Sequence, residues 1–494
     1  MGIIQRQSIK NSIVSYAGVI IAIFATLFIY KLDEEIYGFA HFLYSTAFLL
    51  SPIASFGITA SLIKFFPSFS DRKEAYFNTI LGLLIIANFV FLAFFFLFQE
   101  SIFTLLVKVG IDQNNLIRQY AWAIVPLSLI INLNLLFISH ASNLLRIVIP
   151  EIINNIGYKI ALPIIVFAGY KGFIDKSGIA IAILFFFLMI SLCLCVYLFR
   201  LGAIAFSSGV LKNTTKSFKS ELAKFSLFNG FNTLGGSLAF RIDIIMISTM
   251  IGLEATGIYG IIVFLANVIE IPRKAISRIA APIISKAWAE NDIIELRTIY
   301  QKSSINLLLI GFLICFSIWF SLPFLDTISV GENRFVIYKY VFLFLSLGKL
   351  FDLMTSVNGE ILIYSKDYKY NLLFLLILGC VNVILNLYLI RVYGIVGAAA
   401  ATCCSYFLFN LVKFLFITIK YKLTPFNNKT VLLLLIGVVV FTVVSYIPLA
   451  KDFLLNPIIR IILLALLYIP TVIYMKISPD ANKILFGMIE KLRK

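Results

Sequence analysis

Long apolar runs alternate with short polar stretches along the whole chain. About fourteen of these runs are long enough to cross a bilayer, which takes about 20 helical residues. They cover residues 9–30, 36–64, 76–98, 117–139, 144–169, 178–200, 223–250, 256–285, 303–323, 335–364, 370–391, 395–419, 430–449 and 456–475. Because a segment in lipid must satisfy its backbone hydrogen bonds internally, the pattern predicts an all-α polytopic membrane protein with about 14 transmembrane helices.

One stretch of the chain repeats another in altered form. Residues 10–67 and 224–286 each consist of two long apolar runs joined by a short polar turn, and the tripeptide Ile-Tyr-Gly recurs at 36–38 and 258–260. Duplicated helical units are typical of transporters in which one half moves against the other around a site at the membrane centre. We therefore expect two pseudo-symmetric six-helix lobes, followed by two extra C-terminal helices.

This expectation sets the domain boundaries. Residues 1–205 form the N-terminal lobe and residues 223–421 the C-terminal lobe, and residues 206–222, which are polar and basic, form a cytoplasmic linker between them. Residues 422–494 hold the last two spans and a cytoplasmic tail, whose end has the pattern of a short amphipathic helix on the inner membrane surface.

Composition agrees with a lipid environment. Hydrophobic residues make up 61% of the 494 residues and charged residues only 13%, and the mean hydropathy is +1.00, whereas soluble domains carry about 25% charged residues. The net charge of +17 is interpreted as membrane topology rather than as nucleic-acid binding. With both termini cytoplasmic, about 24 basic residues fall on the inner loops and tail and about 8 on the outer loops, as the positive-inside rule requires.

Several features that resemble functional signals have simpler interpretations. The N-terminal apolar run is too long for a cleavable signal peptide, and the six cysteines lie in apolar runs without metal-ligand or disulfide spacing. His41 and His140 suit either a proton relay or a tolerated position near the interface. The acidic stretch 33–35 is interpreted as a helix cap, and the glycines of 230–236 as close helix packing.

Charged residues inside the spans are the candidates for chemistry, because each costs about 2.5–3.5 kcal/mol at the centre of a lone helix. Arg241 and Asp243 lie two residues apart in one span, which is about 200° of helical rotation, so they must face different neighbours. We expect one to line a cavity and the other to pair with another helix. The alternative is a structural salt bridge between helices.

The second copy of the repeat carries cations that the first lacks. Where the first copy has Ile53, Ala54 and Ile58, the second has Arg273, Lys274 and Arg278. These three cations form either a basic rim at the depth of a phosphate headgroup or side chains that reach the inner headgroups by themselves. Glu270, three residues before Arg273, is expected to pair with it.

Two polar stripes lie within spans. One comprises Lys349, Asp352, Ser356 and Glu360, spaced three or four residues apart on one helical face, and the other comprises Glu151, Asn155 and Lys159 beside Tyr158. Such stripes on spans of both lobes predict a polar cavity. The alternative for the first stripe is mutual neutralisation of Lys349 and Asp352.

At the level of motifs the chain resembles a known family. The segments that carry the resemblance are 36–38, 258–260, 240–248 (FRIDIIMIS), 272–282 and 393–410. They are similar to the polysaccharide biosynthesis, or O-antigen (Wzx-like), flippase family of the MOP (multidrug/oligosaccharidyl-lipid/polysaccharide) exporter superfamily, which includes lipid II flippases and MATE drug exporters.

The resemblance implies a function. Two lobes would form a V whose cavity opens alternately to either side. Proteins of this family move undecaprenyl-pyrophosphate-linked oligosaccharide, such as an O-antigen unit for lipopolysaccharide, from the inner to the outer leaflet of the bacterial inner membrane. The implied partners are this lipid-linked saccharide, membrane lipids, and polysaccharide polymerase and assembly proteins, but not nucleic acid. No cofactor is implied beyond a coupling H⁺ or Na⁺.

The candidate residues fit these roles. The cations expected to bind a pyrophosphate in low dielectric are Arg241, Lys349, Lys159, Arg273, Lys274 and Arg278. The acids expected to take up the coupling ion are Asp243, Asp352, Glu151 and Glu360. No catalytic residue and no metal site are expected.

Two alternatives remain open at this point. A MATE-like cation-coupled drug exporter has the same fold, although the first span here lacks the buried acid that such exporters commonly use. A membrane glycosyltransferase or polymerase would need a sizeable outer loop with clustered acids or arginines, and the largest outer loop, residues 99–119, lacks them.

Overall fold

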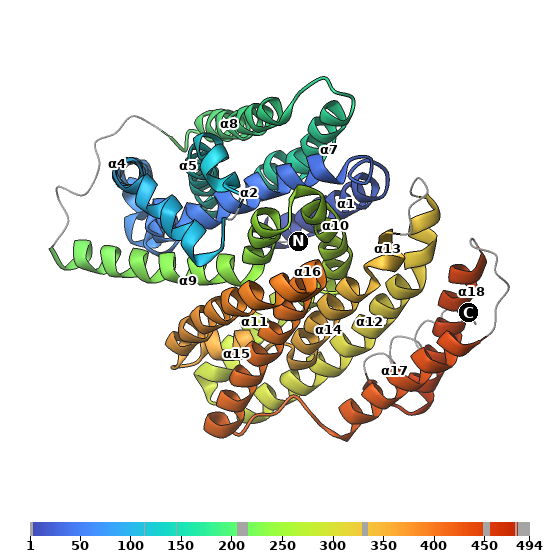
Figure 1. Cartoon of the computed structure of the whole chain (residues 1–494). Coiled ribbons are helices and arrows are strands. Elements are labelled where there is room, and N and C mark those ends of the chain that lie inside the picture. Colours follow the sequence, from blue (N-terminus) through green and yellow to red (C-terminus); the bar gives the residue numbers. More distant parts are fainter. Residues whose placement is uncertain are drawn as a thin grey trace. The chain divides into compact units, whose positions relative to one another are not determined.

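A computed structural model describes residues 3–112, 114–144, 146–204, 216–328, 334–447, 455–479 and 482, and within these ranges the chain forms helices and no strand (Figure 1). In chain order the helices are α1 (Ile3–Phe28), α2 (Glu34–Ser55), α3 (Ile58–Lys64), η1 (Phe66–Arg72), α4 (Lys73–Val109), α5 (Leu116–Asn143), α6 (Val148–Glu151), η2 (Ile152–Ile156), α7 (Gly157–Tyr170), α8 (Lys176–Arg200), α9 (Lys216–Met250), α10 (Leu253–Val268), α11 (Ile271–Glu290), α12 (Ile293–Ile328), α13 (Arg334–Ile337), α14 (Lys339–Thr355), α15 (Asn358–Tyr364), α16 (Tyr368–Tyr421), α17 (Asn428–Tyr446) and α18 (Leu455–Tyr474).

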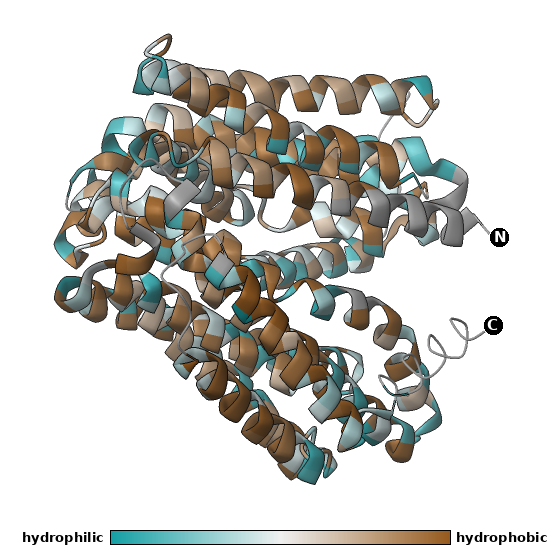
Figure 2. Ribbon diagram, turned by 90° about the vertical axis from the view of Figure 1, so that its right-hand side faces the viewer, coloured by the Kyte–Doolittle hydropathy of each residue, from teal (hydrophilic) through white to brown (hydrophobic). Residues whose placement is uncertain are grey.

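The predicted spans correspond to these helices, so the all-α membrane architecture is confirmed. Among the described residues, 9 helices are long and apolar enough to cross a membrane, or up to 11 if each bent pair is one span. Two predicted spans, 370–391 and 395–419, are the halves of α16, which kinks at Gly394 (φ 58°, ψ −138°). Figure 2 shows apolar residues along the helices and polar residues towards many of their ends. The chain is therefore a multi-pass membrane protein.

Three predicted spans are broken rather than continuous. The span 36–64 is divided into α2 and α3 at Phe56 and Gly57, which have φ of 47° and 69°. The span 256–285 is divided between α10 and α11, and Pro272 lies in the first turn of the new helix, where its missing N–H costs nothing. The third break, between α14 and α15, bends the chain by 50°. Both copies of the repeat thus have a break within their second span.

The chain divides into two compact units, residues 1–260 and residues 261–494. The first unit includes α9, which packs against α2 and α3. A Cβ added to Gly57 would lie 2.2 Å from the Ser226 carbonyl oxygen, so only glycine allows this approach. The lobe boundaries inferred from the duplication stay a prediction, because these units are defined by packing and not by repetition. Most of the predicted linker and tail lies outside the described residues.

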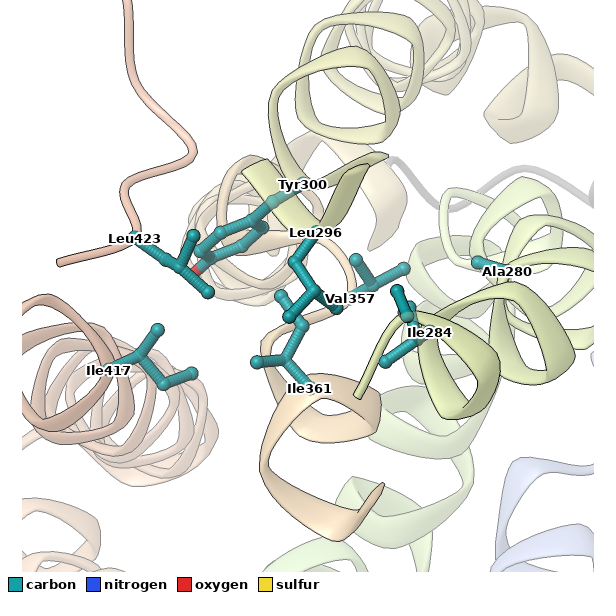
Figure 3. Packing of buried hydrophobic residues seen from close by; sticks show 9 residues of the cluster. Ala280, Ile284, Leu296, Tyr300, Val357, Ile361, Ile417 and Leu423 are labelled. Carbon is teal, nitrogen blue, oxygen red and sulfur yellow. The ribbon is translucent and has the colours of Figure 1, made fainter. Parts of the chain in front are cut away.

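The second unit has an apolar cluster beside the break between α14 and α15 (Figure 3). Val357 and Ile361 pack there with Ile284 of α11 and with Leu296 and Tyr300 of α12, all fully buried. These contacts hold α15 against α11 and α12. The break is therefore fixed in place by packing.

Arg460 of α18 is predicted to stabilise the hairpin of α17 and α18. The last four carbonyl groups of a helix lack partners within it, and the Arg460 guanidinium donates to the carbonyl oxygens of Val444, Ser445 (3.1 Å) and Ile447 (3.3 Å). Replacing Arg460 with Leu should lower the free energy of unfolding by about 1.5–3 kcal/mol, the range for hydrogen bonds to a charged group. Thermal unfolding in detergent measures this effect, and R460K, which cannot span three carbonyls, should recover only part of it. Equal midpoints for R460L and wild type would contradict the role.

Candidate functional site

A buried network of charged side chains lies where α14 packs against the second half of α16. The Lys349 ammonium donates to Glu270 Oε2 (2.7 Å) and to the Tyr406 hydroxyl (2.9 Å). The Lys349 and Glu270 side chains are only 10% and 18% exposed. The two helices approach closely because residue 348 is glycine, where an added Cβ would lie 3.3 Å from Cys403 Cα. The lysine is thus held by one carboxylate and one hydroxyl.

Arg273 forms the second ion pair of this network. Its Nε lies 3.1 Å from Asp352 Oδ2 and 3.4 Å from the Ser356 carbonyl oxygen, and its Nη1 lies 3.9 Å from Glu270 Oε1. The expected pairing of Glu270 with Arg273 is confirmed. Lys349 and Asp352 take these separate partners, Glu270 at the N-terminus of α11 and Arg273 in its first turn, and do not form a pair with each other.

The predicted stripe on one helical face ends at the break. Ser356 has φ 51° and ψ −113° and terminates α14, so Glu360 belongs to α15 and does not continue the α14 face. Glu360 is half-buried and interacts electrostatically with both Arg273 and Lys413. The single-helix interpretation of this stripe was wrong, because hydropathy does not report a bend within an apolar run.

Three buried residues of α16 at this site were not predicted from the sequence: Lys413, Asn410 and Tyr406. Asn410 Oδ1 accepts hydrogen bonds from Thr355 Oγ1 (2.9 Å) and Asn358 Nδ2 (3.1 Å). Lys413 is 5% exposed, and its Nζ lies 3.8 Å from the centroid of the Phe409 ring. A signal was available, since Lys413 is a charge inside the predicted span 395–419.

Arg241 and Asp243 lie in the first unit and face different neighbours, as their spacing predicted. The Asp243 carboxylate accepts a hydrogen bond from the Tyr259 hydroxyl (2.7 Å). The Arg241 guanidinium lies over the rings of Phe48 (4.1 Å) and Tyr44 (5.0 Å) of α2, and among the described residues no carboxylate forms an ion pair with it. An arginine held by aromatic faces keeps its charge available for an anion.

The stripe of Glu151, Asn155 and Lys159 also lies in the first unit. Asn155 Nδ2 donates to Glu151 Oε1 (2.6 Å), across the π-helical turn η2. Such single π turns are frequent at functional sites. Lys159 reaches α1, where an added Cβ on Gly18 would lie 3.0 Å from its Nζ.

The remaining predicted residues have simpler positions. Lys274 is exposed, and the side chain of Arg278 lies outside the described part of the chain. Asp33 Oδ1 accepts from the Ile36 backbone N–H (2.9 Å), which confirms the capping interpretation. His140 is buried and its Nε2 hydrogen-bonds the Ala203 carbonyl oxygen (3.0 Å).

Chemically, the network of the second unit balances its charges. Its three cations, Lys349, Arg273 and Lys413, are matched in number by three acids, Glu270, Asp352 and Glu360. Within the described ranges, no group of three or more His, Cys, Asp or Glu side chains is placed to hold a metal ion.

Comparisons with known proteins agree with this architecture. The family profile described as "Polysaccharide biosynthesis protein" matches residues 8–289. No curated protein matches the chain in sequence.

Solved membrane transporters share the fold. The lipid II flippase MurJ in an inward closed conformation superposes with a TM-score of 0.70 at 14% identity, over 94% of this chain and 98% of that one. A multidrug resistance MATE family transporter of the MOP superfamily in an inward-facing conformation gives 0.60 at 13% identity, over 82% and 94%. A MOP superfamily transporter from Pyrococcus furiosus, described as having reverse polarity of its binding pocket, gives 0.54 at 16% identity, over 85% and 95%.

Proposed function

Since the chain belongs to the polysaccharide biosynthesis protein family and has the fold of MOP superfamily transporters, we propose that it is a flippase and not an enzyme. The proposed substrate is an undecaprenyl-pyrophosphate-linked oligosaccharide, an O-antigen or other surface polysaccharide unit. The protein would move it from the inner to the outer leaflet of a bacterial cytoplasmic membrane by alternating access, coupled to an ion gradient.

The observation that carries this proposal is the environment of Arg241. Its guanidinium rests on the faces of Phe48 and Tyr44 and is not neutralised by a described carboxylate. A planar guanidinium donates paired hydrogen bonds to phosphate oxygens. A pyrophosphate entering low dielectric needs such a donor, because an unpaired charge there is very costly.

The other predicted residues have subordinate roles in this proposal. Lys159 would add a second cation in the first unit, and Lys274 and Arg278 would attract the headgroup from the membrane surface. Lys349 and Arg273 are held by acids in this conformation, so they would bind substrate only after those acids take up a cation. Asp243, Asp352, Glu151 and Glu360 are the candidates for that uptake.

Replacing Arg241 with Ala is expected to lower the rate of translocation of a labelled lipid-linked oligosaccharide in proteoliposomes by about 10- to 100-fold. This range corresponds to the loss of about 1.5–3 kcal/mol from charge-assisted hydrogen bonds. R241K should retain part of the rate, since it keeps the charge but not the planar fork. R118A is the matched control, because Arg118 pairs with Glu100 on an exposed surface.

Three outcomes would count against the proposal. Equal translocation rates for R241A and R118A would remove its main support. Transport of cationic dyes without transport of lipid-linked saccharide would indicate a MATE-like exporter. Polymer formation by the purified protein without translocation would indicate a glycosyltransferase or polymerase.

A further inference from the structure

Four tyrosines of the first unit lie together beside Arg241. The Tyr44 ring of α2 and the Tyr158 ring of α7 have centroids 5.0 Å apart, and the Tyr37 ring of α2 stacks on the Tyr30 ring at 4.1 Å. Tyr158 interacts electrostatically with the other three tyrosines and with Arg241, whose guanidinium lies 5.0 Å from the centroid of the Tyr44 ring. These contacts bring four phenol groups and one cation to the same place.

Packing within the protein holds these rings. The Phe187 ring of α8 contacts the rings of both Tyr44 and Tyr158, with centroids 5.7 Å apart in each pair. Tyr30 and Tyr37 are each only 6% exposed, whereas Tyr44 and Tyr158 are partly exposed. The rings therefore have defined positions without a ligand, and they carry their hydroxyl groups to defined positions as well.

The hydroxyl groups of these four tyrosines form no hydrogen bond with any described residue. Other tyrosines of the same unit do: the Tyr76 hydroxyl donates to the Ser61 carbonyl oxygen (2.7 Å), and the Tyr259 hydroxyl donates to the Asp243 carboxylate (2.7 Å). A buried tyrosine usually finds such a partner, and a polar group without one is costly within a membrane. Because phenylalanine would fill the same space without this cost, the hydroxyls point to a polar ligand.

The neighbouring charge restricts the chemistry of this ligand. Aromatic rings alone attract organic cations, but the guanidinium of Arg241 repels them. An acyl chain would leave the hydroxyls of the tyrosines unpaired. A saccharide fits both conditions, because it is uncharged where it meets the rings and its hydroxyl groups can both donate to and accept from a phenol.

We propose that the hydroxyls of Tyr44 and Tyr158 hydrogen-bond the sugar next to the pyrophosphate, and that Tyr37 and Tyr30 supply further hydroxyls to the same saccharide. This site rests on the proposed function, because a pyrophosphate bound by Arg241 is what places a sugar beside the two rings. A site built to hydrogen-bond a substrate hydroxyl discriminates against a ligand that lacks it. The tyrosines would therefore make the protein prefer the sugar-bearing lipid over the same polyprenyl pyrophosphate without sugar.

The test measures binding of soluble probes to the purified full-length protein in detergent. The probes are farnesyl pyrophosphate, and farnesyl pyrophosphate linked to glucose, to galactose or to the N-acetylamino form of either sugar. Wild type should bind at least one sugar-bearing probe about tenfold more tightly than farnesyl pyrophosphate, as one or two added hydrogen bonds allow. Y44F and Y158F remove only a hydroxyl, so each should weaken binding of that probe by about 3- to 10-fold and leave binding of farnesyl pyrophosphate unchanged. R241A should weaken binding of both.

Y170F is the matched control, because Tyr170 lies on the same helix as Tyr158 and is 42% exposed. It should bind every probe as wild type does. Thermal unfolding in detergent adds a second measurement. Y44F and Y158F should unfold at the midpoint of wild type or above it, because their hydroxyls have no partner among the described residues. Y76F, which loses the hydrogen bond to Ser61, should unfold at a lower temperature.

The site is overturned if no sugar-bearing probe binds wild type more tightly than farnesyl pyrophosphate does, or if Y44F and Y158F bind the sugar-bearing probe as wild type does. Lower unfolding midpoints for these two variants would equally overturn it, because their hydroxyls would then be paired within the protein. Sugar-dependent binding without translocation of lipid-linked oligosaccharide in proteoliposomes would count against the proposed function alone. Translocation by the double variant Y44F/Y158F at the wild-type rate, with the wild-type preference for sugar, would count against this site alone.

Discussion

Replacing Lys349 with Met is expected to lower the free energy of unfolding by about 3–5 kcal/mol, the cost of removing one partner from a buried ion pair. Glu270 would keep its charge at a site where its side chain is 18% exposed, and the Tyr406 hydroxyl would lose its donor at 2.9 Å. Arg273, at 3.9 Å from Glu270 and already bound to Asp352, can compensate only in part.

The double variant K349M/E270Q should recover most of this loss, because it removes the charge that the single variant leaves without a partner. Thermal unfolding of the purified protein in detergent compares the single and double variants. The control K286M breaks a pair whose side chains are 73% and 59% exposed, and exposed pairs contribute about 0–1 kcal/mol. If the double variant were as unstable as K349M, the lysine would stabilise the protein through packing and not through charge.

The membrane architecture could be predicted from the sequence because the length and hydropathy of an apolar run indicate whether the segment lies in lipid or in water. The same reasoning identified Arg273, Lys349 and Asp352, since a charge within a span is costly and therefore informative. The structure brings these three together with Glu270. Applied without omission, the rule would also have found Lys413.

The partners of these charges could not be predicted. Lys349 and Asp352 lie three residues apart and suggest a local pair, yet each bonds to a residue about 80 positions away. That choice depends on the break before α11 and on the close approach of α14 and α16 at Gly348. Neither feature has a signature in a hydropathy pattern, because both arise from tertiary packing.

The helix breaks could not be predicted from the sequence either. A hydropathy run stays continuous through Phe56 and Ser356, although both have positive φ. The close packing expected of the glycines in 230–236 is confirmed at Gly230, where an added Cβ would lie 3.2 Å from the Gly57 backbone nitrogen. The helix that packs against a glycine, however, is determined by the tertiary structure and cannot be predicted from the hydropathy pattern.

Replacing Gly257 with Ala is expected to destabilise the first unit by about 3 kcal/mol or more, at the upper end of the cost of overpacking. A Cβ on Gly257 would lie 1.9 Å from the Glu34 carbonyl oxygen, and a Cβ on Gly38 would lie 1.8 Å from the Leu253 carbonyl oxygen. The starts of α2 and α10 therefore meet backbone to backbone, as small residues permit in membrane helices. No side-chain rotation relieves a contact with backbone, so the two helices must separate.

Gly82 of α4 provides the matched control, because among the described residues no atom outside its own helical turn lies within 4 Å of a Cβ added there. G82A should leave the midpoint of thermal unfolding unchanged or raise it, since Ala is favoured over Gly in a helix by about 1 kcal/mol. Ala at position 257 gains the same helix propensity, so the loss of stability measured for G257A is smaller than the cost of the clash itself. Equal midpoints for G257A and G82A would mean that α2 and α10 can separate without cost, and Gly257 and Gly38 would then have no packing role at this crossing.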